Sequence, residues 1–446
     1  MTRTLIWGFQ YDVGEKILTE LKKNFNVVFT INNHNGNNLN LQKICSGYLD
    51  DNYTINHTSL NDFENFRNKY FYTFQIMMTS RNANDRNVNE TMNEFVILYY
   101  YFSSLIREKE IELCIFSALP HQGPEYVIYQ LSREMKIDTL ICTPSILPNK
   151  FFLTETIEDF GNFFNSPQIN SNEINFNRKA YTERINQLFL DVKNDTKISN
   201  FFGKERIFRK ILLNILINLK LVNRKDPQKE YLSNLKELTK DKETLDKILK
   251  SKKKLIYFPL HLQPELSTSG LGENYKDQLL AIETLSSAIN DNWKIIIKEN
   301  PVQGYFQRGK IFFRRLKNIK KTIVVNKKIN SEYLIKNTNL TATISGNAGW
   351  EALLNSKKTL FFGNAWYANL HGTKKFNNNT SLSEIENFCN SQFDEKKFQA
   401  DLSNLLSKMG TGVIEPFYKQ FVNNFDIQKN AISVSNYISK FLKNKK

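Results

Sequence analysis

The sequence predicts an α/β protein made of two Rossmann-like domains that face a cleft, with a helical insertion between them and further helices at the C-terminus. Two observations carry this prediction. Short apolar runs alternate with amphipathic helical stretches over residues 1–150, and the same alternation resumes at residue 253. Such alternation is typical of a parallel sheet that is covered by helices on both faces.

The domain boundaries follow from changes in this pattern. We expect a first Rossmann-like domain, a helical interdomain region, a second Rossmann-like domain and a set of C-terminal helices, over residues 1–150, 151–250, 251–390 and 391–446 respectively. The C-terminal helices are expected to pack back on the first domain.

The first domain opens as a βαβ unit. Residues 5–7 and 26–31 are apolar runs that flank an amphipathic stretch. Further strands are expected at 111–119 and 139–145, after a helical, aromatic-rich region over 59–108. Strands joined through helices in this way pair in parallel.

The interdomain region contains one unusual segment, residues 205–225. It is apolar over most of its helical circumference and basic at both ends. A helix in a core or between domains is the favoured interpretation, and a helix that lies on a membrane surface is the alternative.

The second domain alternates more regularly than the first. Its strands are expected at 254–258, 293–298, 322–326, 340–345 and 359–363. In doubly wound sheets, ligands bind beyond the carboxyl ends of the strands. Polar residues that directly follow these strands are therefore candidates for a binding site.

The composition restricts the class of protein and of partner. Hydrophobic residues make up 41% of the chain, which excludes a disordered or fibrous protein. The net charge of +16 suits a negatively charged partner, such as a nucleotide sugar, an anionic glycan or an anionic membrane face. Nucleic acid is not expected, because no zinc-finger, RNP or helix-turn-helix signature occurs.

Cysteine usage and the N-terminus indicate the compartment. The four cysteines form no CxxC pair, which favours small buried thiols in a reducing environment. The N-terminus lacks the apolar core of a signal peptide, and no run reaches the roughly 18 apolar residues that span a bilayer. We expect a cytoplasmic protein, with peripheral contact at the inner face of the membrane as an extension of that expectation.

The first candidate site follows the strand at 254–258. Polar and hydroxylated side chains gather there within nine residues, namely His261, Gln263, Glu265, Ser267, Thr268 and Ser269. Hydroxyl and backbone N–H groups suit phosphate or sugar oxygens, so we expect a donor-binding site. A structural histidine whose hydrogen bonds are satisfied internally is the alternative.

Two further candidates follow the strands at 293–298 and 340–345. Lys298 ends the first of these strands and Asn300 follows it, which offers a positive charge and an amide to a phosphate. After the second strand, a tight turn starts a helix whose first N–H groups can bind an anion. We expect donor contacts from Ser345, Gly346, Asn347, Ala348 and Glu351, the last reaching a ribose hydroxyl. A glycine turn required only for packing is the alternative.

The first domain supplies the candidates for acid–base chemistry. His121 lies just past the strand at 111–119, Glu125 follows four residues later, and Asp12 lies in the first turn after residues 5–7. An imidazole or a carboxylate near a hydroxyl can act as a general base. The alternative is that His121 caps the next helix and Glu125 faces solvent. No pair of carboxylates follows a strand in the manner of a metal site, so no metal is expected.

Several of these segments resemble bacterial capsule and surface-polysaccharide biosynthesis proteins, the group that includes the Kdo-type capsule transferases. The matching stretches are "YFPLHLQPE" (257–265), "IKENP" (297–301), "SGNAGWEAL" (345–353), "FFGNAWY" (361–367) and, less specifically, "LPHQGPEYVIYQLSREMKI" (119–137). Their order and spacing carry the resemblance, which is concentrated in residues 253–370.

The resemblance implies a GT-B glycosyltransferase that takes an ulosonic acid, Kdo or a nonulosonic acid, from a CMP-activated donor to a glycan or lipid-linked acceptor. It implies no cofactor beyond that donor. Related transferases contact the donor phosphate through a Lys-x-His-Pro segment, whereas this chain has Asn300 in place of the histidine. The amide can bind a phosphate oxygen but carries no proton for catalysis. A sugar-nucleotide epimerase or hydrolase of the same architecture, and a non-catalytic glycan-assembly partner, are the alternatives.

Overall fold

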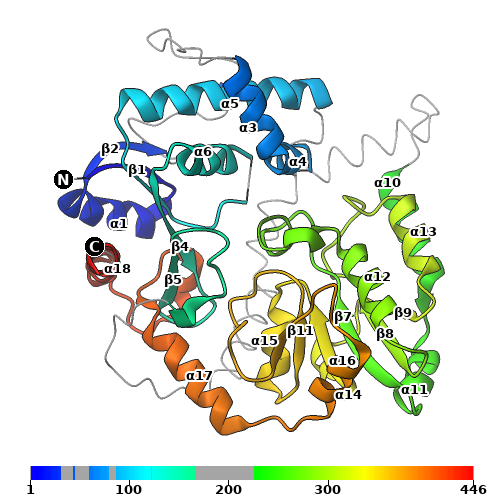
Figure 1. Ribbon diagram of the computed structural model, residues 1–446. Coiled ribbons are helices and arrows are strands. Elements are labelled where there is room, and N and C mark those ends of the chain that lie inside the picture. The colour runs from blue at the N-terminus through cyan, green and yellow to red at the C-terminus, as the bar shows by residue number, and fades with distance from the viewer. Residues whose placement is uncertain are drawn as a thin grey trace.

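The computed structural model contains two α/β domains that lie side by side, which confirms the predicted fold class (Figure 1). It describes residues 2–31, 44–45, 60–79, 87–121, 123–165 and 226–444. The domain boundaries stay predictions, because much of the region 151–250 lies outside these ranges.

The first domain is built on a sheet with strand order β13-β5-β4-β3-β1-β2. Four of its strands run parallel to one another: β1 (Arg3–Trp7), β2 (Asn26–Ile31), β3 (Leu113–Phe116) and β4 (Asp138–Pro144). Two antiparallel strands complete one edge: β5 (Lys150–Thr154) and β13 (Gly410–Thr411). Every residue of β3 is buried, as expected for a central parallel strand.

Helices cover both faces of this sheet. They are α1 (Tyr11–Asn24), α3 (Leu60–Lys69), α4 (Phe71–Thr79), α5 (Val88–Glu108) and α6 (Gly123–Glu134). The long helix α5 begins at a capping box, in which Asn87 and Glu90 each accept from the other's backbone N–H. Its aromatic face packs into the core through Phe95 and Phe102, both fully buried.

The second domain is built on a seven-stranded sheet that is parallel throughout, with order β12-β11-β10-β7-β8-β9-β6. The strands are β6 (Thr239–Lys240), β7 (Lys254–Pro259), β8 (Trp293–Lys298), β9 (Thr322–Val325), β10 (Leu340–Thr343), β11 (Thr359–Phe361) and β12 (Thr373–Lys375). The chain adds strands on one side of β7 up to β9 and then returns to add β10 on the other side. The strand order therefore reverses between β7 and β10, where doubly wound proteins bind their ligands.

Short helices connect these strands. They are α10 (Pro227–Leu238), α11 (Lys242–Leu249), α12 (Gln278–Ala288), α13 (Lys310–Asn318), α14 (Ser331–Asn337), α15 (Asn347–Leu354) and α16 (Leu382–Asn390), with the helical turns η3 (Leu266–Gly270) and η4 (Glu273–Lys276).

The chain then crosses back to the first domain through α17 (Glu395–Ser407), β13, η5 (Pro416–Phe421) and α18 (Ile427–Lys443) (Figure 1). Helix α18 buries Ala431, Val434 and Ile438 in one cluster with α1 residues such as Val13 and Ile17. Because β13 also joins the first sheet, the C-terminal segment completes the N-terminal domain.

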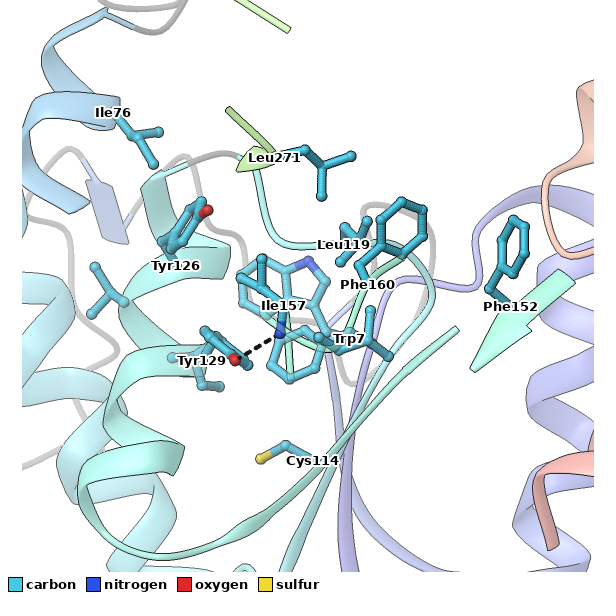
Figure 2. Packing of buried hydrophobic residues seen from close by; sticks show 14 of the residues in the cluster. Trp7, Ile76, Cys114, Leu119, Tyr126, Tyr129, Phe152, Ile157, Phe160 and Leu271 are labelled. Atoms are coloured by element: carbon cyan, nitrogen blue, oxygen red, sulfur yellow. Dashed lines mark hydrogen bonds between the residues drawn. The ribbon is translucent and has the colours of Figure 1, made fainter. Parts of the chain in front are cut away.

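One apolar cluster joins the two domains. Figure 2 shows Leu271 of the second domain beside Leu119 and Phe160 of the first. The ring of Phe152 in β5 lies 5.9 Å, centroid to centroid, from that of Trp366. The two domains therefore share one apolar core on this side.

Most predicted strands coincide with observed ones, and β2 and β8 have the predicted bounds. The sequence prediction missed β5, β6, β12 and β13, which lie at or next to sheet edges. The segment 205–225 lies outside the described residues. Cys114 and Cys142 are buried thiols that form no disulfide, as expected.

The packing of α18 predicts a large difference between two isoleucines of that helix. Ile438 is fully buried against α1, whereas Ile432 is 41% exposed. Ile438→Ala should lower the free energy of unfolding by about 2 to 5 kcal/mol, because it removes buried methyl groups and leaves a cavity. Ile432→Ala, the matched control, should change it by less than about 0.5 kcal/mol. Urea titration of both variants measures the difference, and equal midpoints would contradict the docking of α18.

Candidate functional site

The candidate site lies where the strand order of the second sheet reverses. Strands β7 and β10 are hydrogen-bonded neighbours and run in the same direction, so their carboxyl ends meet at one edge of the sheet. His261 follows β7, and Ser345 and Gly346 follow β10. The structure thus brings together two segments that the sequence analysis selected separately.

His261 is the centre of this arrangement. Its Nε2 lies 2.9 Å from Thr343 Oγ1 and accepts from the backbone N–H of Ile344 at 3.3 Å, while Nδ1 lies 2.9 Å from Ser267 Oγ. Since Nε2 accepts from a backbone amide, Nδ1 carries the proton and donates it to Ser267. Burial, with a smaller contribution from the charge of Arg308, lowers the pKa of His261 to about 4. The imidazole is therefore neutral, and it ties the β7 end to the β10 end.

The ring of His261 leaves no room for a side chain at Gly346. A Cβ on this residue would lie 2.6 Å from Cε1 of His261, which no side chain can occupy. The N–H of Gly346 donates to Thr343 Oγ1 at 3.3 Å, and its carbonyl accepts from the hydroxyl of Tyr367 at 2.7 Å. A substitution here would displace His261, whatever it did to a bound phosphate.

Helix α15 begins directly after this glycine. Gly346 provides no side-chain cap for the first turn. The N–H of Gly349 donates to the carbonyl of Gly346 at 3.1 Å, and the N–H groups of Asn347 and Ala348 precede it at the helix start, where an outside acceptor can bind. Asn347 is exposed at the first position of the helix, and Ala348 is partly exposed beside it. A helix start with small residues lets an anion approach the backbone closely.

Hydroxyl groups in and next to η3 form hydrogen bonds within the protein that stabilise this helical turn. Ser345 Oγ donates to the carbonyl of Ser267 at 2.7 Å, and Thr268, which is fully buried, donates to the carbonyl of Glu265 at 3.2 Å. Ser267 Oγ is engaged by His261. These side chains shape the wall of the site, and their contact with a ligand, predicted from the sequence, stays a prediction.

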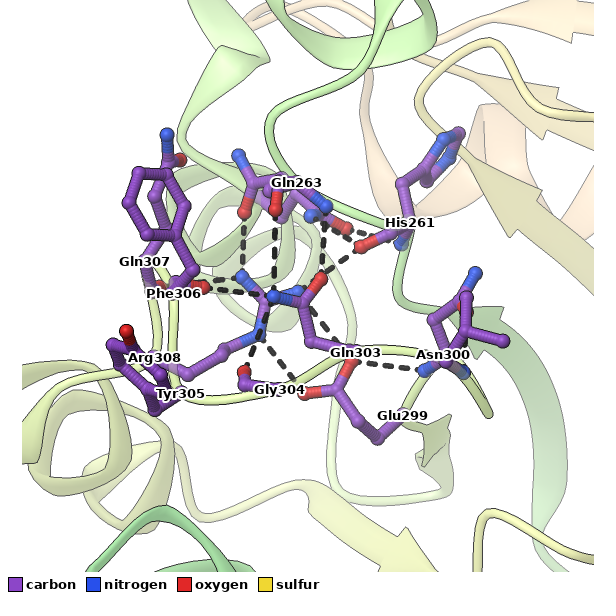
Figure 3. Close-up of polar contacts among 12 residues, drawn as sticks. His261, Gln263, Glu299, Asn300, Gln303, Gly304, Tyr305, Phe306, Gln307 and Arg308 are labelled. Carbon is purple, nitrogen blue, oxygen red and sulfur yellow. Dashed lines mark hydrogen bonds and ion pairs between the residues drawn. The ribbon is translucent and has the colours of Figure 1, made fainter. Parts of the chain in front are cut away.

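A buried network behind this wall was missed by the sequence analysis (Figure 3). Arg308, fully buried, donates to Glu299 Oε2 at 2.9 Å, to Gln263 Oε1 at 2.6 Å and to the carbonyl of His261 at 3.1 Å. Gln303 accepts from the N–H of Gln263 at 2.8 Å. Gln263, predicted to bind the donor, is instead a bridge within this network. The sequence contained no signal for Arg308 beyond an isolated arginine ahead of a helix.

Lys298 and Asn300 also have partners within the protein. The ammonium of Lys298, 5% exposed, donates to the carbonyl of Ile329 at 2.9 Å and to Ser331 Oγ at 2.5 Å. Asn300 accepts from the N–H of Val302 at 3.0 Å. The expectation that Lys298 leaves its strand as an open cation is thus not met, because the strand end is covered by α14.

Glu351 lies on α15, and its side chain is exposed. Desolvation raises the pKa of its carboxyl to about 7, with the charge of Lys298 opposing the shift and that of Glu332 adding to it. A carboxyl at this position can bind a ribose hydroxyl in either protonation state, because the ionised form accepts a hydrogen bond and the protonated form can also donate one.

The first domain presents His121 and Glu125 to the same region. His121 Nδ1 donates to the carbonyl of Leu119 at 2.8 Å, which leaves Nε2 unprotonated in the neutral ring. The carboxylate of Glu125 accepts from the N–H of His121 at 3.2 Å and from the indole of Trp7 at 3.3 Å. Glu125 thus accepts from two protein donors, and the role of either residue as a general base stays a prediction.

The first domain contacts the second domain at η3. A Cβ on Gly270 would lie 3.5 Å from the carbonyl oxygen of Pro120 and 3.8 Å from Cβ of His121. His121, the candidate base, therefore lies beside η3, and Ser267 of this turn hydrogen-bonds to His261. Asp12 is placed differently: it is half exposed, and its carboxylate pairs with Lys419 at 2.8 Å, which lowers its pKa.

Within the ranges that the structure describes, no group of three or more His, Cys, Asp or Glu side chains is placed to hold a metal ion. Within the same ranges, no helix combines the length and apolarity needed to cross a bilayer.

One known protein family matches the part of the chain that contains the second domain. Residues 217–418 match the family model described as capsule polysaccharide biosynthesis protein. This segment contains β6 to β12 and the start of α15, and so it contains the candidate donor site. The resemblance predicted from the sequence motifs is thereby confirmed over this segment. No curated protein matches the chain significantly.

Solved structures give weak matches over most of the chain. A β-Kdo 2,7 transferase, KpsC of Thermosulfurimonas dismutans, is 13% identical over 78% of this chain and 89% of its own, with a TM-score of 0.33. A UDP-GlcNAc 2-epimerase of Methanocaldococcus jannaschii is 14% identical over 91% and 98%, with a TM-score of 0.28. A trehalose-6-phosphate protein of E. coli bound to UDP-2-fluoro glucose is 11% identical over 99% of both chains, with a TM-score of 0.31. At these identities and TM-scores, the likeness does not identify an activity.

The neutral state of His261 predicts a pH dependence of stability. Its pKa is about 4 in the folded protein and 6.5 when solvated, so below about pH 6.5 only the unfolded chain takes up the proton. Stability should therefore fall as the pH decreases, by on the order of 2 to 3 kcal/mol near pH 4.5. His261→Asn should show a shallower loss between about pH 7 and pH 4.5 in urea titrations. Ile438→Ala controls for destabilisation alone, and identical pH profiles for wild type and His261→Asn would refute the assignment.

Proposed function

We propose, from the match of residues 217–418 to capsule polysaccharide biosynthesis proteins, that this protein is a glycosyltransferase. In this proposal it moves an ulosonic acid, Kdo or a nonulosonic acid, from a CMP-activated donor to a surface glycan or a lipid-linked acceptor. The observation that carries the proposal is the uncapped start of α15 at the reversal of strand order, because a nucleotide phosphate binds at such a position in doubly wound domains.

The donor would lie against the second domain. Its phosphate would accept from the first N–H groups of α15, with Asn347 beside it and no side chain at Gly346 in the way. Glu351, one turn further along, would contact the ribose. The N–H groups would stabilise the charge that develops on the departing CMP. The proposal includes neither a metal ion nor a further cofactor.

The acceptor would approach from the first domain. The unprotonated Nε2 of His121 would accept the proton of the acceptor hydroxyl as that oxygen bonds to the anomeric carbon, while the bond from that carbon to the CMP oxygen breaks. Glu125 would hold the backbone of His121 in place. We place the reaction in the cytoplasm, at the inner face of the membrane, where a basic protein meets anionic lipids.

A charge introduced at the start of α15 tests the donor site. Asn347→Asp should lower CMP affinity at least about tenfold, because the new carboxylate repels the phosphate. It should not destabilise the fold, since an acidic residue is favourable at a helix start. Calorimetric titration with CMP in the presence of EDTA measures the effect. Asn93→Asp, exposed on α5, is the control. Unchanged affinity, or a preference for UDP over CMP in the wild type, would contradict the proposed donor site.

Removal of the base tests the acceptor side. His121→Ala should lower the transfer rate at saturating donor by about 10²-fold or more, which is the usual contribution of general-base assistance. Glu125→Gln should have a smaller effect, because Glu125 acts through His121. CMP affinity should stay unchanged in both variants. If both transfer at the wild-type rate, His121 only supports the loop and the base lies elsewhere, with Asp12 as the next candidate.

A further inference from the structure

A groove with a volume of about 1020 Å³ lies between the two domains, on the far side of η3 from His261. Helix α4 of the first domain forms one wall, and the start of α13 forms the other. We call it the α4–α13 groove. Ser269 of η3 lines it, whereas Ser267 of the same turn binds His261. The groove and the candidate donor site therefore share η3 as a common wall.

Four cationic side chains line this groove, and two of them are already neutralised. Arg315 pairs with Asp277 at 2.6 Å and with Glu283 at 2.8 Å, and Lys310 lies 3.5 Å from Glu230.

Lys276 and Arg314 are the other two cations. Among the residues that the structure describes, neither has an acidic side chain within ion-pair distance. The groove therefore carries a positive charge that its own residues do not balance.

Lys276 is held in position for an anion. Its ammonium lies 3.0 Å from the centroid of the Tyr72 ring on α4, and its carbonyl accepts from Gln263 Nε2 at 2.9 Å. Partial burial lowers the pKa of Lys276 to about 8, which reflects a cation that lacks a counter-charge. An anion in the groove would restore that charge balance.

Apolar side chains from α4 and α13 form another part of the groove wall. Ile311 is 72% exposed at the start of α13, and Phe312 and Met78 are half-buried beside it. Together these side chains offer an apolar surface to a group that enters the groove. The groove thus combines two unpaired cations with an uncovered hydrocarbon surface.

We propose that the α4–α13 groove binds a phosphate group carried on a hydrocarbon chain. Lys276 and Arg314 would contact the phosphate, which suits two cations because it carries up to two charges. Ile311 and Phe312 would contact the first methylene groups of the chain. On the proposed function, on which this last step rests, the ligand is the lipid end of the acceptor, and η3 lies between that lipid end and the donor.

Calorimetry on the full chain with decyl phosphate below its micelle concentration tests the proposal. Lys276→Gln and Arg314→Gln should each weaken binding about tenfold, the usual loss for a hydrogen bond to a charged group. Lys317→Gln, on the exposed face of α13, is the matched control and should bind like wild type. Ile311→Ser should weaken decyl phosphate binding but leave inorganic phosphate binding unchanged.

The other ligands distinguish the possible outcomes. Inorganic phosphate should bind at least about tenfold more weakly than decyl phosphate, and octyl glucoside should not compete, if both parts of the ligand are recognised. Equal binding of inorganic phosphate, equal binding of the neutral amphiphile, or no effect of Lys276→Gln would each overturn the proposal. CMP affinity should stay unchanged in Lys276→Gln, so a failure of the donor site would be visible separately.

Discussion

The ion pair between Arg308 and Glu299 is the constraint on which the geometry of both candidate sites depends. Both side chains are buried, and such a pair offsets its desolvation only when every remaining hydrogen-bonding group finds a partner. Here those partners are the carbonyl of His261 and the side chain of Gln263. The hydrogen bonds that Arg308 donates thereby fix the position of the segment after β7, which contains His261 and leads into η3.

The same guanidinium reaches the α4–α13 groove. Its planar group lies 4.4 Å from the ring centroid of Phe312 at the start of α13. Gln263, which accepts from Arg308, donates in turn to the carbonyl of Lys276. One buried cation therefore orients the wall of the candidate donor site and two residues of the groove.

The domain interface differs from one side to the other. Near Trp366 the two domains share an apolar cluster, in which the ring of Phe152 from the first domain lies 5.9 Å, centroid to centroid, from that of Trp366. Near α13 they are separated by the basic groove and are linked by polar contacts such as that from Gln307 Nε2 to the carbonyl of Thr79 at 3.2 Å. The apolar side of the interface fixes the position of His121 relative to η3. The groove side leaves room for a ligand.

Much of this protein was determined by its sequence alone. Strands such as β2 and β8 were predicted with their observed bounds, and His261, Ser345 and Gly346 were selected because each follows a buried strand. These are local properties: apolar runs and small-residue turns are legible in a short window, and the strand order of a doubly wound sheet then brings their ends together. Among the strands that were missed, β13 pairs with β5, a segment that is remote in the chain.

The tertiary structure alone decided what the selected side chains do. Lys298 has the same sequence signal as an open cation, but the position of α14 buries its ammonium. Gln263 was indistinguishable from a ligand-binding amide until Arg308 was seen beside it. The protonation of His261 depends on the backbone amide of Ile344, which lies 83 residues away. Hydrogen bonding and burial depend on distances across the fold, and no local pattern encodes them.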